Sequence, residues 1–252
     1  MRPWILMYHS VAPYQHDPYL VTVRPERLDA QFRWLRRAGL RGVGVGDLLA
    51  ARRRGAVRGL VGLTFDDGYR DFAHTVVPLL RRHGFGATVY VVAGRLGGSN
   101  HWDPDGERKE LMTADEVAGV AADGVEVGAH GMTHVPLAAP IEATDLTLEV
   151  EESRRVLEDL VRRPVAGFCY PYGAHDDRAV AAVRAAGYEH ACATGRPDRP
   201  GPLALPRTYV GDRDGALRLA AKWGRHAGAE AREARRPDSD GAPVPAVDRG
   251  EG

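Results

Sequence analysis

The chain has few cysteines, almost no lysine and no excess of either charge. Cys169 and Cys192 are the only cysteines among 252 residues, too few for a framework of disulfides. We expect two buried thiols, although the sequence alone leaves a pair open. Lys109 and Lys222 are the only lysines, so arginine supplies nearly all of the basic charge. The 34 basic residues balance the 34 acidic residues, and this neutral total gives no reason to expect a nucleic-acid partner.

The chain also lacks long apolar runs and a secretory signal. No run approaches the ~18 residues that a membrane-spanning helix requires. The chain opens Met1-Arg2-Pro3 and continues directly into Trp4–Tyr8, which has the length of a strand and lacks a small-residue cleavage site. If this start is the true one, we expect a cytoplasmic protein without a membrane span. An upstream start codon that encodes a leader would change that expectation.

Apolar segments of strand length alternate with segments of helical periodicity along most of the chain. This alternation predicts a parallel sheet with right-handed crossovers, and 252 residues fit one α/β barrel. We expect a single catalytic domain over residues 1–228. Residues 229–252 are small, charged and proline-containing. They predict a disordered tail, because such a composition cannot bury enough apolar surface to offset its ordering entropy.

The most informative stretch is Thr64–Gly68, which reads Thr-Phe-Asp-Asp-Gly. It follows the apolar run Leu60–Leu63, so a buried strand should end here. Asp66 and Asp67 then lie side by side at the carboxyl end of that strand. Neighbouring carboxylates oppose each other's ionisation unless they share a cation or a proton. The alternative is that one of them only caps the next helix.

A second polar motif, His130–His134, also follows an apolar run, Val125–Ala129. Two histidines four residues apart face the same side if the segment turns helically. One carboxylate and two imidazoles make a three-ligand site with open positions for water and substrate, as catalytic zinc requires. The other carboxylate is then available as a base. The occurrence of both motifs weakens the alternative of two surface histidines and a helix cap.

These two motifs are followed by Pro171-Tyr172-Gly173. The three in this order resemble the polysaccharide deacetylases of carbohydrate esterase family four. The resemblance runs from about Trp4 to Trp223, nearly all of the chain that we expect to be ordered. It implies a distorted (β/α)7-type barrel, a divalent metal that is usually zinc, and hydrolysis of N-acetyl groups on amino sugars.

The resemblance also implies roles for single residues. Carried over position by position, the metal ligands are Asp67, His130 and His134. Asp66 is the general base that takes a proton as water attacks. The backbone N–H of Tyr172 helps to bind the oxyanion, together with a metal that polarises the acetyl carbonyl.

Two positions depart from the pattern of that family. Its third motif commonly begins with an arginine that orients the base, and here that position is Cys169. Its last motif commonly carries a histidine that acts as the general acid, and Leu203–Arg207 contains none. An amine is a poor leaving group without a proton, so the reaction needs an acid from another position.

Two residues are predicted to fill these gaps. His9 follows the first strand, on the rim that should also hold Asp66. The Tyr8-His9 pair resembles the poly-N-acetylglucosamine deacetylase branch, where such a histidine occupies the site. We therefore predict that His9 is the general acid, with a helper histidine as the alternative. Arg207, at the end of the last strand, is predicted to be the partner of Asp66.

Weaker candidates lie in loops near the same rim. Trp102 and Tyr172 are candidates for stacking on sugar faces, and His101 and His175 for other substrate contacts. The predicted partner is an N-acetylated sugar, and the sequence indicates no protein partner. Amide or imide hydrolysis, O-acetyl ester hydrolysis on a non-polymeric substrate, and a catalytically inactive binding module remain alternatives. The complete set of acidic and histidine residues argues against the inactive module.

Overall fold

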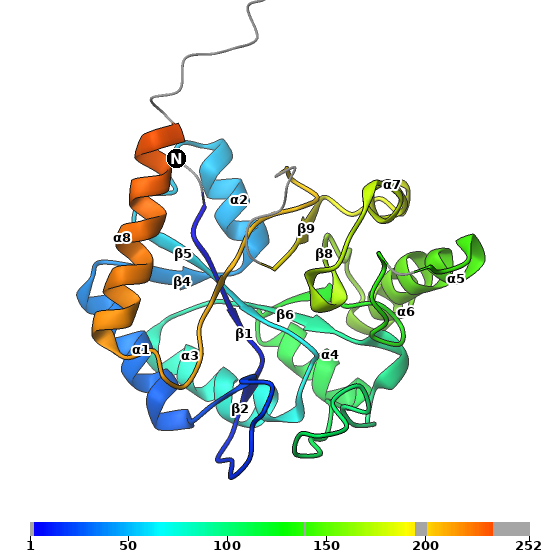
Figure 1. The fold of residues 1–252 in the computed structure, drawn as a ribbon, viewed down its shortest axis with the longest axis horizontal. Helices are drawn as coiled ribbons and strands as arrows, with labels where there is room; N and C mark the ends of the chain where they lie inside the picture. Colours follow the sequence, from blue (N-terminus) through cyan, green and yellow to red (C-terminus); the bar gives the residue numbers. More distant parts are fainter. Residues whose placement is uncertain (1–2, 139, 195–200, 234–252) are drawn as a thin grey trace, which may run out of the picture.

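A parallel sheet forms the centre of the protein (Figure 1). The computed structural model describes residues 3–138, 140–194 and 201–233. Its strands are β1 Ile5–Tyr8, β2 Ser10–Val11, β3 Thr22–Val23, β4 Arg41–Val43, β5 Leu60–Phe65, β6 Thr88–Val91, β7 Glu126–Ala129, β8 Gly167–Cys169, β9 His190–Cys192 and β10 Thr208–Tyr209. The order β10-β1-β5-β6-β7-β8-β9, with β4 beside β5 and every pairing in the sheet parallel, confirms the predicted (β/α)7-type barrel.

The barrel is distorted where β9 meets β1. Cys192 of β9 forms an isolated parallel bridge with Leu205, and three residues later Thr208 of β10 pairs with Leu6 of β1. One short segment therefore contacts the strand on each side of it. The sequence predicted a single strand over residues 205–210, whereas the structure has a bridge followed by a two-residue strand.

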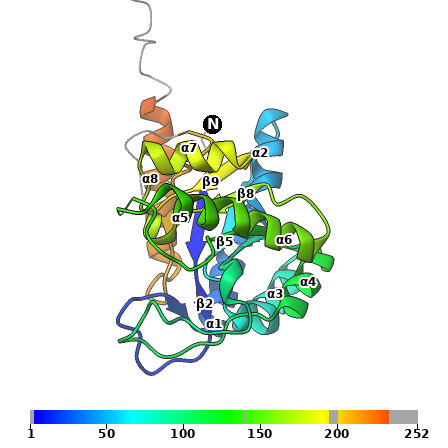
Figure 2. The same cartoon turned by 90° about the vertical axis from the view of Figure 1, so that its right-hand side faces the viewer.

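Helices surround the sheet on its outside (Figures 1 and 2). The α-helices are α1 Pro25–Arg37, α2 Val45–Arg53, α3 Val77–His83, α4 Ala114–Ala122, α5 Ala143–Thr147, α6 Ser153–Val161, α7 Asp177–Ala185 and α8 Ala216–Glu233. Pro25 opens α1 at a position where its missing N–H costs nothing. A capping box opens α4, since Thr113 and Glu116 exchange side-chain and backbone hydrogen bonds there.

Short π and 3₁₀ segments complete the helical structure: the π segments η1 Phe72–Val76 and η3 Leu148–Glu152, and the 3₁₀ turns η2 Ala93–Arg95 and η4 Pro171–Gly173. The sequence predicted one helix over residues 142–163. The chain does stay helical there, but η3 joins α5 to α6 through a π turn. A π turn inserts one extra residue into a helical turn, and such turns occur frequently at functional sites.

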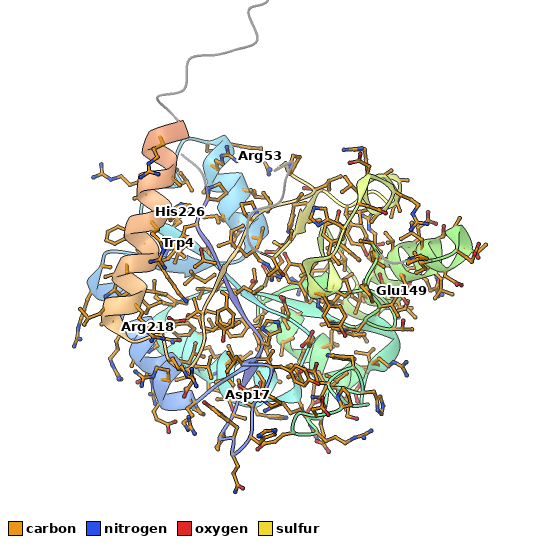
Figure 3. All side chains as sticks on the ribbon, viewed as in Figure 1. Trp4, Asp17, Arg53, Glu149, Arg218 and His226 are labelled. Carbon is orange, nitrogen blue, oxygen red and sulfur yellow. The ribbon has the colours of Figure 1, made fainter. Side chains whose placement is uncertain are left out.

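Helix α8 packs against the start of the sheet, where the ring of Trp4 stacks on His226 with centroids 5.9 Å apart (Figure 3). The helix continues to Glu233, so residues 229–233 of the predicted tail are helical. The rest of that tail, residues 234–252, lies outside the described residues. Among the helices of the described ranges, none is both long and apolar enough to cross a membrane.

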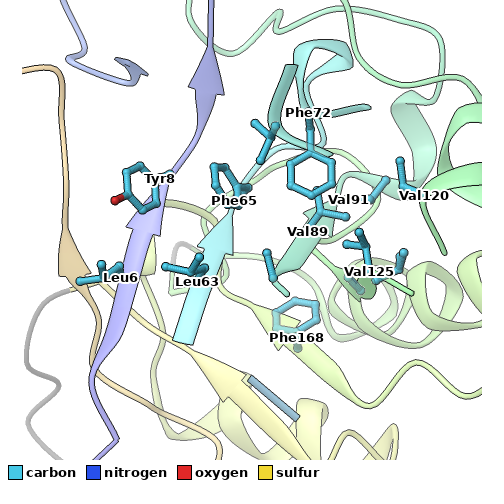
Figure 4. Close-up of a cluster of buried hydrophobic side chains, with 14 of the residues drawn as sticks. Leu6, Tyr8, Leu63, Phe65, Phe72, Val89, Val91, Val120, Val125 and Phe168 are labelled. Atoms are coloured by element: carbon cyan, nitrogen blue, oxygen red, sulfur yellow. The ribbon is translucent and has the colours of Figure 1, made fainter. Parts of the chain in front are cut away.

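Alternation along the strands divides the core into two clusters. Leu6, Val89 and Phe168 belong to the larger cluster, which packs against the helices (Figure 4). Their strand neighbours Ile5, Tyr90 and Cys169 belong to a smaller cluster on the opposite face of the sheet, because successive strand side chains point to opposite faces. Both cysteines lie in this smaller cluster as free, buried thiols, as predicted.

Candidate metal centre and active site

The paired aspartates lie where β5 ends. The N–H of Asp66 donates to the carbonyl of Tyr8 at 3.0 Å, which continues the pairing of β5 with β1. Asp67 then adopts a left-handed conformation with φ +72°, and Gly68 does the same. Aspartate tolerates this region better than most residues. The left-handed turn replaces strand alternation, so both carboxylates face the barrel end, and each residue is only 3% exposed.

The two histidines meet through a loop rather than through the predicted helical turn. Residues 130–134 contain no helix, and both Gly131 (φ +78°) and His134 (φ +68°) have left-handed backbones. This path brings the Nε2 atoms of His130 and His134 to 3.3 and 3.2 Å from Oδ1 of Asp67. The three residues expected to bind metal therefore form one buried cluster whose donor atoms lie within 4.8 Å of one another.

The donor atoms in this cluster are oriented for a cation. Nδ1 of His130 lies 2.7 Å from the carbonyl oxygen of Cys169. A carbonyl only accepts, so Nδ1 carries the proton and Nε2 presents its lone pair toward Asp67. Oδ1 of Asp67 is buried and has no hydrogen-bond partner of acceptable geometry among the described residues. One carboxylate oxygen and two imidazole nitrogens suit zinc or a similar divalent ion, so the residues fit the metal that the resemblance implies.

The electrostatics keep Asp67 ionised, which is the form that binds a metal. Burial alone raises the pKa of its carboxyl group. Favourable interactions with the imidazoles of His130 and His134 outweigh burial, and the pKa lies well below its ordinary value.

Asp66 is held by an arginine from the other end of the chain. The guanidinium of Arg207 donates from Nη1 and Nη2 to the two carboxylate oxygens at 2.6 and 2.7 Å. Arg207 also donates to Thr64 Oγ1 and to the carbonyl of Ala193. Burial raises the pKa of Asp66, but the charge and hydrogen bonds of Arg207 outweigh it and the net pKa is lowered.

Cys169 lies beside this ion pair. Nη2 of Arg207 is 3.1 Å from its sulfur, which in turn lies 3.7 Å from Oδ2 of Asp66. The small thiol thus fills the position where the resemblance leads one to expect an arginine, and Arg207 reaches the same carboxylate from the last strand. The pairing of Asp66 with Arg207 is the one that the sequence analysis anticipated.

His9 also lies beside the carboxylate of Asp66. Tyr8 and Phe65 are register partners, so the residues that follow β1 and β5 emerge side by side. Nε2 of His9 lies 3.8 Å from Oδ2 of Asp66, and its side chain is 18% exposed. Nδ1 of His9 is buried without a hydrogen-bond partner in the described part of the chain. The His9 side chain therefore lies close to the proposed base and is partly exposed to solvent.

Tyr172 follows β8 and has a left-handed backbone with φ +57°. Its side chain is 56% exposed, and its ring meets the ring of His134 edge-on with centroids 4.7 Å apart. No acceptor among the described residues is hydrogen-bonded to its backbone N–H. Gly173 is needed for this turn, because a Cβ there would come within 2.4 Å of Thr194. The turn leaves the Tyr172 N–H available to an external oxygen.

Other loop candidates make contacts within the protein. The Trp102 ring stacks on the metal-ligand candidate His134 at 4.2 Å and 25°, so one of its faces is covered. His101 is exposed and contacts Arg108, 2.8 Å away. His175 stacks on a core tyrosine and its Nδ1 lies 2.9 Å from the Gly173 carbonyl. Of the predicted sugar-stacking pair, Tyr172 is the more exposed.

One important residue was missed by sequence reasoning. Glu149, on η3, is buried (Figure 3) and accepts hydrogen bonds from the Met132 and Thr133 N–H groups at 2.8 and 3.1 Å and from the Thr133 hydroxyl. It thereby fixes the backbone between the two histidines. A charged residue within the inward stripe of Leu146 and Val150 was the signal that could have revealed it.

Replacing Glu149 with alanine is expected to loosen the histidine loop. The free energy of unfolding should fall by about 2–4 kcal/mol, because three donors lose a charged acceptor. Affinity for a divalent ion should fall roughly 10–100-fold, since Glu149 holds the backbone that positions the two histidine ligands. Glu151→Ala, an exposed neighbour, is the matched control. Equal ion affinity in Glu149→Ala and Glu151→Ala, measured by titration, would contradict this role.

Fold and site together define a class. This is a parallel α/β barrel with two aspartates and two histidines at the carboxyl ends of its strands, which is where α/β-barrel enzymes place their active sites. Within that class, the chain belongs to the polysaccharide deacetylase family, whose sequence model matches residues 54–191.

Two relatives agree with this assignment. The chain is 22% identical over 187 residues to Bacillus subtilis YxkH, a polysaccharide deacetylase by name. The aligned region covers 73% of this chain and 62% of that protein. It is 34% identical over 88 residues to the poly-beta-1,6-N-acetyl-D-glucosamine N-deacetylase of Escherichia coli K12, covering 32% of this chain and 13% of the enzyme. The chain thus spans less than two thirds of the length of either relative.

Two solved structures share the fold. The Streptococcus pyogenes deacetylase PplD, determined in complex with acetate, superposes with a TM-score of 0.73 over 88% of this chain and 97% of its own, at 21% identity. IcaB from Ammonifex degensii gives a TM-score of 0.71 over 87% and 96%, at 22% identity. At this level of identity the likeness supports the barrel fold.

Proposed function

We propose that the protein is a metal-dependent hydrolase that removes N-acetyl groups from an amino sugar or an N-acetylated glycan. The observation that carries this proposal is the Asp67, His130 and His134 cluster placed directly beside a carboxylate held by Arg207. Family membership supports deacetylation, and the similarity to a poly-beta-1,6-N-acetyl-D-glucosamine N-deacetylase supports an N-acetylated sugar as substrate.

Asp67, His130 and His134 would hold the ion, for which we propose Zn²⁺. When bound, such an ion polarises the acetyl carbonyl and lowers the pKa of a water molecule. The chain supplies the rest of the chemistry. Asp66 accepts a proton from the attacking water, and Arg207 keeps that carboxylate ionised and fixed. The N–H of Tyr172 donates to the oxygen on which negative charge develops.

His9 completes the cycle as the general acid. After water has added to the carbonyl carbon, the carbon–nitrogen bond breaks and the amine leaves with a proton from the imidazolium of His9. The position of His9 beside Asp66 at the mouth of the site supports this role. It also replaces the histidine that the last motif of this chain lacks.

Replacing His9 with glutamine is expected to lower kcat on an N-acetyl sugar roughly 10²–10⁴-fold, the usual contribution of a positioned acid. The same variant should lose much less activity on an aryl acetate, because a phenolate leaves without prior protonation. His16→Gln, an exposed histidine on the loop that follows, is the control. Near-normal turnover of the N-acetyl sugar by the His9 variant would rule out the acid role.

The proposed function is tested by acetate release from three groups of compounds: N-acetylglucosamine oligomers, small amides and O-acetyl sugars. We expect release from the oligomers, abolished by a chelator and restored by Zn²⁺. Release only from small amides would indicate an amidase. Release only from O-acetyl sugars would indicate an esterase, and no release from any compound by zinc-loaded protein would overturn the proposal.

A further inference from the structure

The loop of residues 99–107 lies over the metal-centre candidate in a fixed position. Trp102 anchors it on His134, as described above. Its far side is bound to the loop that follows β2, where Glu107 accepts hydrogen bonds from the N–H groups of Gln15 and His16 at 2.7 and 2.9 Å. This double attachment holds the backbone between Trp102 and Glu107 in a defined position.

Asp103 is the acidic side chain that this loop brings to the mouth of the site. It is half-buried, and the Tyr69 hydroxyl lies 3.4 Å from its Oδ2. Burial and the negative charge of Asp67 raise its pKa to about 6, while the charge of His9 opposes the shift. Asp103 in turn acts on the exposed phenol of Tyr172 and contributes to raising its pKa. Asp103 is therefore in contact with Tyr69, which follows β5, and close enough to His9 and Tyr172 for their charges to interact.

A carboxylate in this place has acceptor capacity that the protein does not use. It offers about four lone-pair positions, and within the described residues its one side-chain hydrogen bond comes from the Tyr69 hydroxyl. It forms no ion pair with any described residue and does not belong to the group of metal-ligand candidates Asp67, His130 and His134. The exposed part of this carboxylate is therefore free to accept hydrogen bonds from a ligand in place of water.

We propose that Asp103 is a substrate-binding residue that accepts hydrogen bonds from hydroxyl groups of the sugar ring whose acetamido group lies at the metal-centre candidate. This inference rests on the proposed function and assigns part of its specificity. The exposed Tyr172, whose ring also contacts His134, offers an apolar surface to the same sugar ring. A few placed polar groups beside an aromatic surface are what fixes a small ligand in a pocket.

The test compares Asp103→Asn with Asp105→Asn, which changes an exposed aspartate of the same loop. Both are assayed at pH 8, above the pKa of Asp103, on an N-acetylglucosamine oligomer and on 4-nitrophenyl acetate, which has no sugar hydroxyls. Asp103→Asn should lower kcat/KM for the oligomer roughly 10–100-fold, mainly through KM. The Asp103→Asn variant should keep its hydrolysis of the aryl ester and its bound metal within about twofold of the wild type. The Asp105→Asn variant should keep kcat/KM for both substrates within the same range.

Three results would overturn the inference: an unchanged KM for the oligomer, an equal loss on both substrates, or a loss of bound metal from Asp103→Asn. The last two would indicate a structural or metal-binding role. If the wild type releases no acetate from any N-acetyl sugar, the proposed function fails separately. The role of Asp103 is then tested by titrating the oligomer into the wild type and into Asp103→Asn. Equal affinity of the two proteins for the oligomer would overturn the inference.

Discussion

Replacing Arg207 with methionine should remove most of the activity at neutral pH and lower the free energy of unfolding by about 3–5 kcal/mol. Both effects have one cause. The guanidinium is the partner of a buried carboxylate and donates to both of its oxygens. Without it, burial raises the pKa of Asp66, so the base is protonated over more of the pH range. The acid limb of the pH–rate profile should therefore move to higher pH.

Two further variants give this prediction its controls. Arg207→Lys keeps the charge but loses the bidentate hydrogen bonding to Asp66, so its activity should lie between those of the wild type and Arg207→Met. Arg213→Met removes an exposed arginine of the same segment and should leave the profile unchanged. A normal pH–rate profile in Arg207→Met would show that Arg207 does not control the base.

Replacing Asp66 with asparagine should lower kcat on an N-acetyl sugar roughly 10²–10⁴-fold, because asparagine cannot take a proton from water. Bound metal should be retained, since the ligand candidates are Asp67 and the two histidines. The free energy of unfolding should also fall, because Arg207 is left as a buried charge without its partner.

The double variant Asp66→Asn/Arg207→Met separates stability from chemistry. Neither residue then leaves an isolated buried charge, so the double variant should be more stable than the sum of the two single losses predicts. Its activity should nevertheless remain as low as that of Asp66→Asn. Recovery of activity together with stability would show that Asp66 has only a structural role.

Sequence patterns were enough to predict the barrel and most of the site, because both depend on where the strands begin and end along the chain. Apolar runs end at Phe65 and Ala129, and the carboxyl ends of parallel strands meet at one end of a barrel. Asp66, Asp67 and His130 had to meet there for that reason. The pairing of Arg207 with Asp66 followed from the same rule, because β10 and β5 both flank β1.

Features set by loop geometry were not predictable in this way. The histidines meet through left-handed residues, Gly131 and His134, rather than through a helical turn. Trp102 contacts His134 because of the path of a long loop, which no periodicity encodes. Asp103 and Glu149 acquire their roles only from neighbours that are distant in sequence, such as Tyr69 and Met132.

The most direct test of this account is the metal content of the purified protein, measured by elemental analysis beside the double variant Asp67→Ala/His134→Ala. The wild type should hold about one equivalent of zinc or a similar divalent ion, as a three-ligand catalytic site does, and the folded double variant should hold none. An absence of metal from the wild type, even after incubation with Zn²⁺ and with the fold intact, would contradict the account.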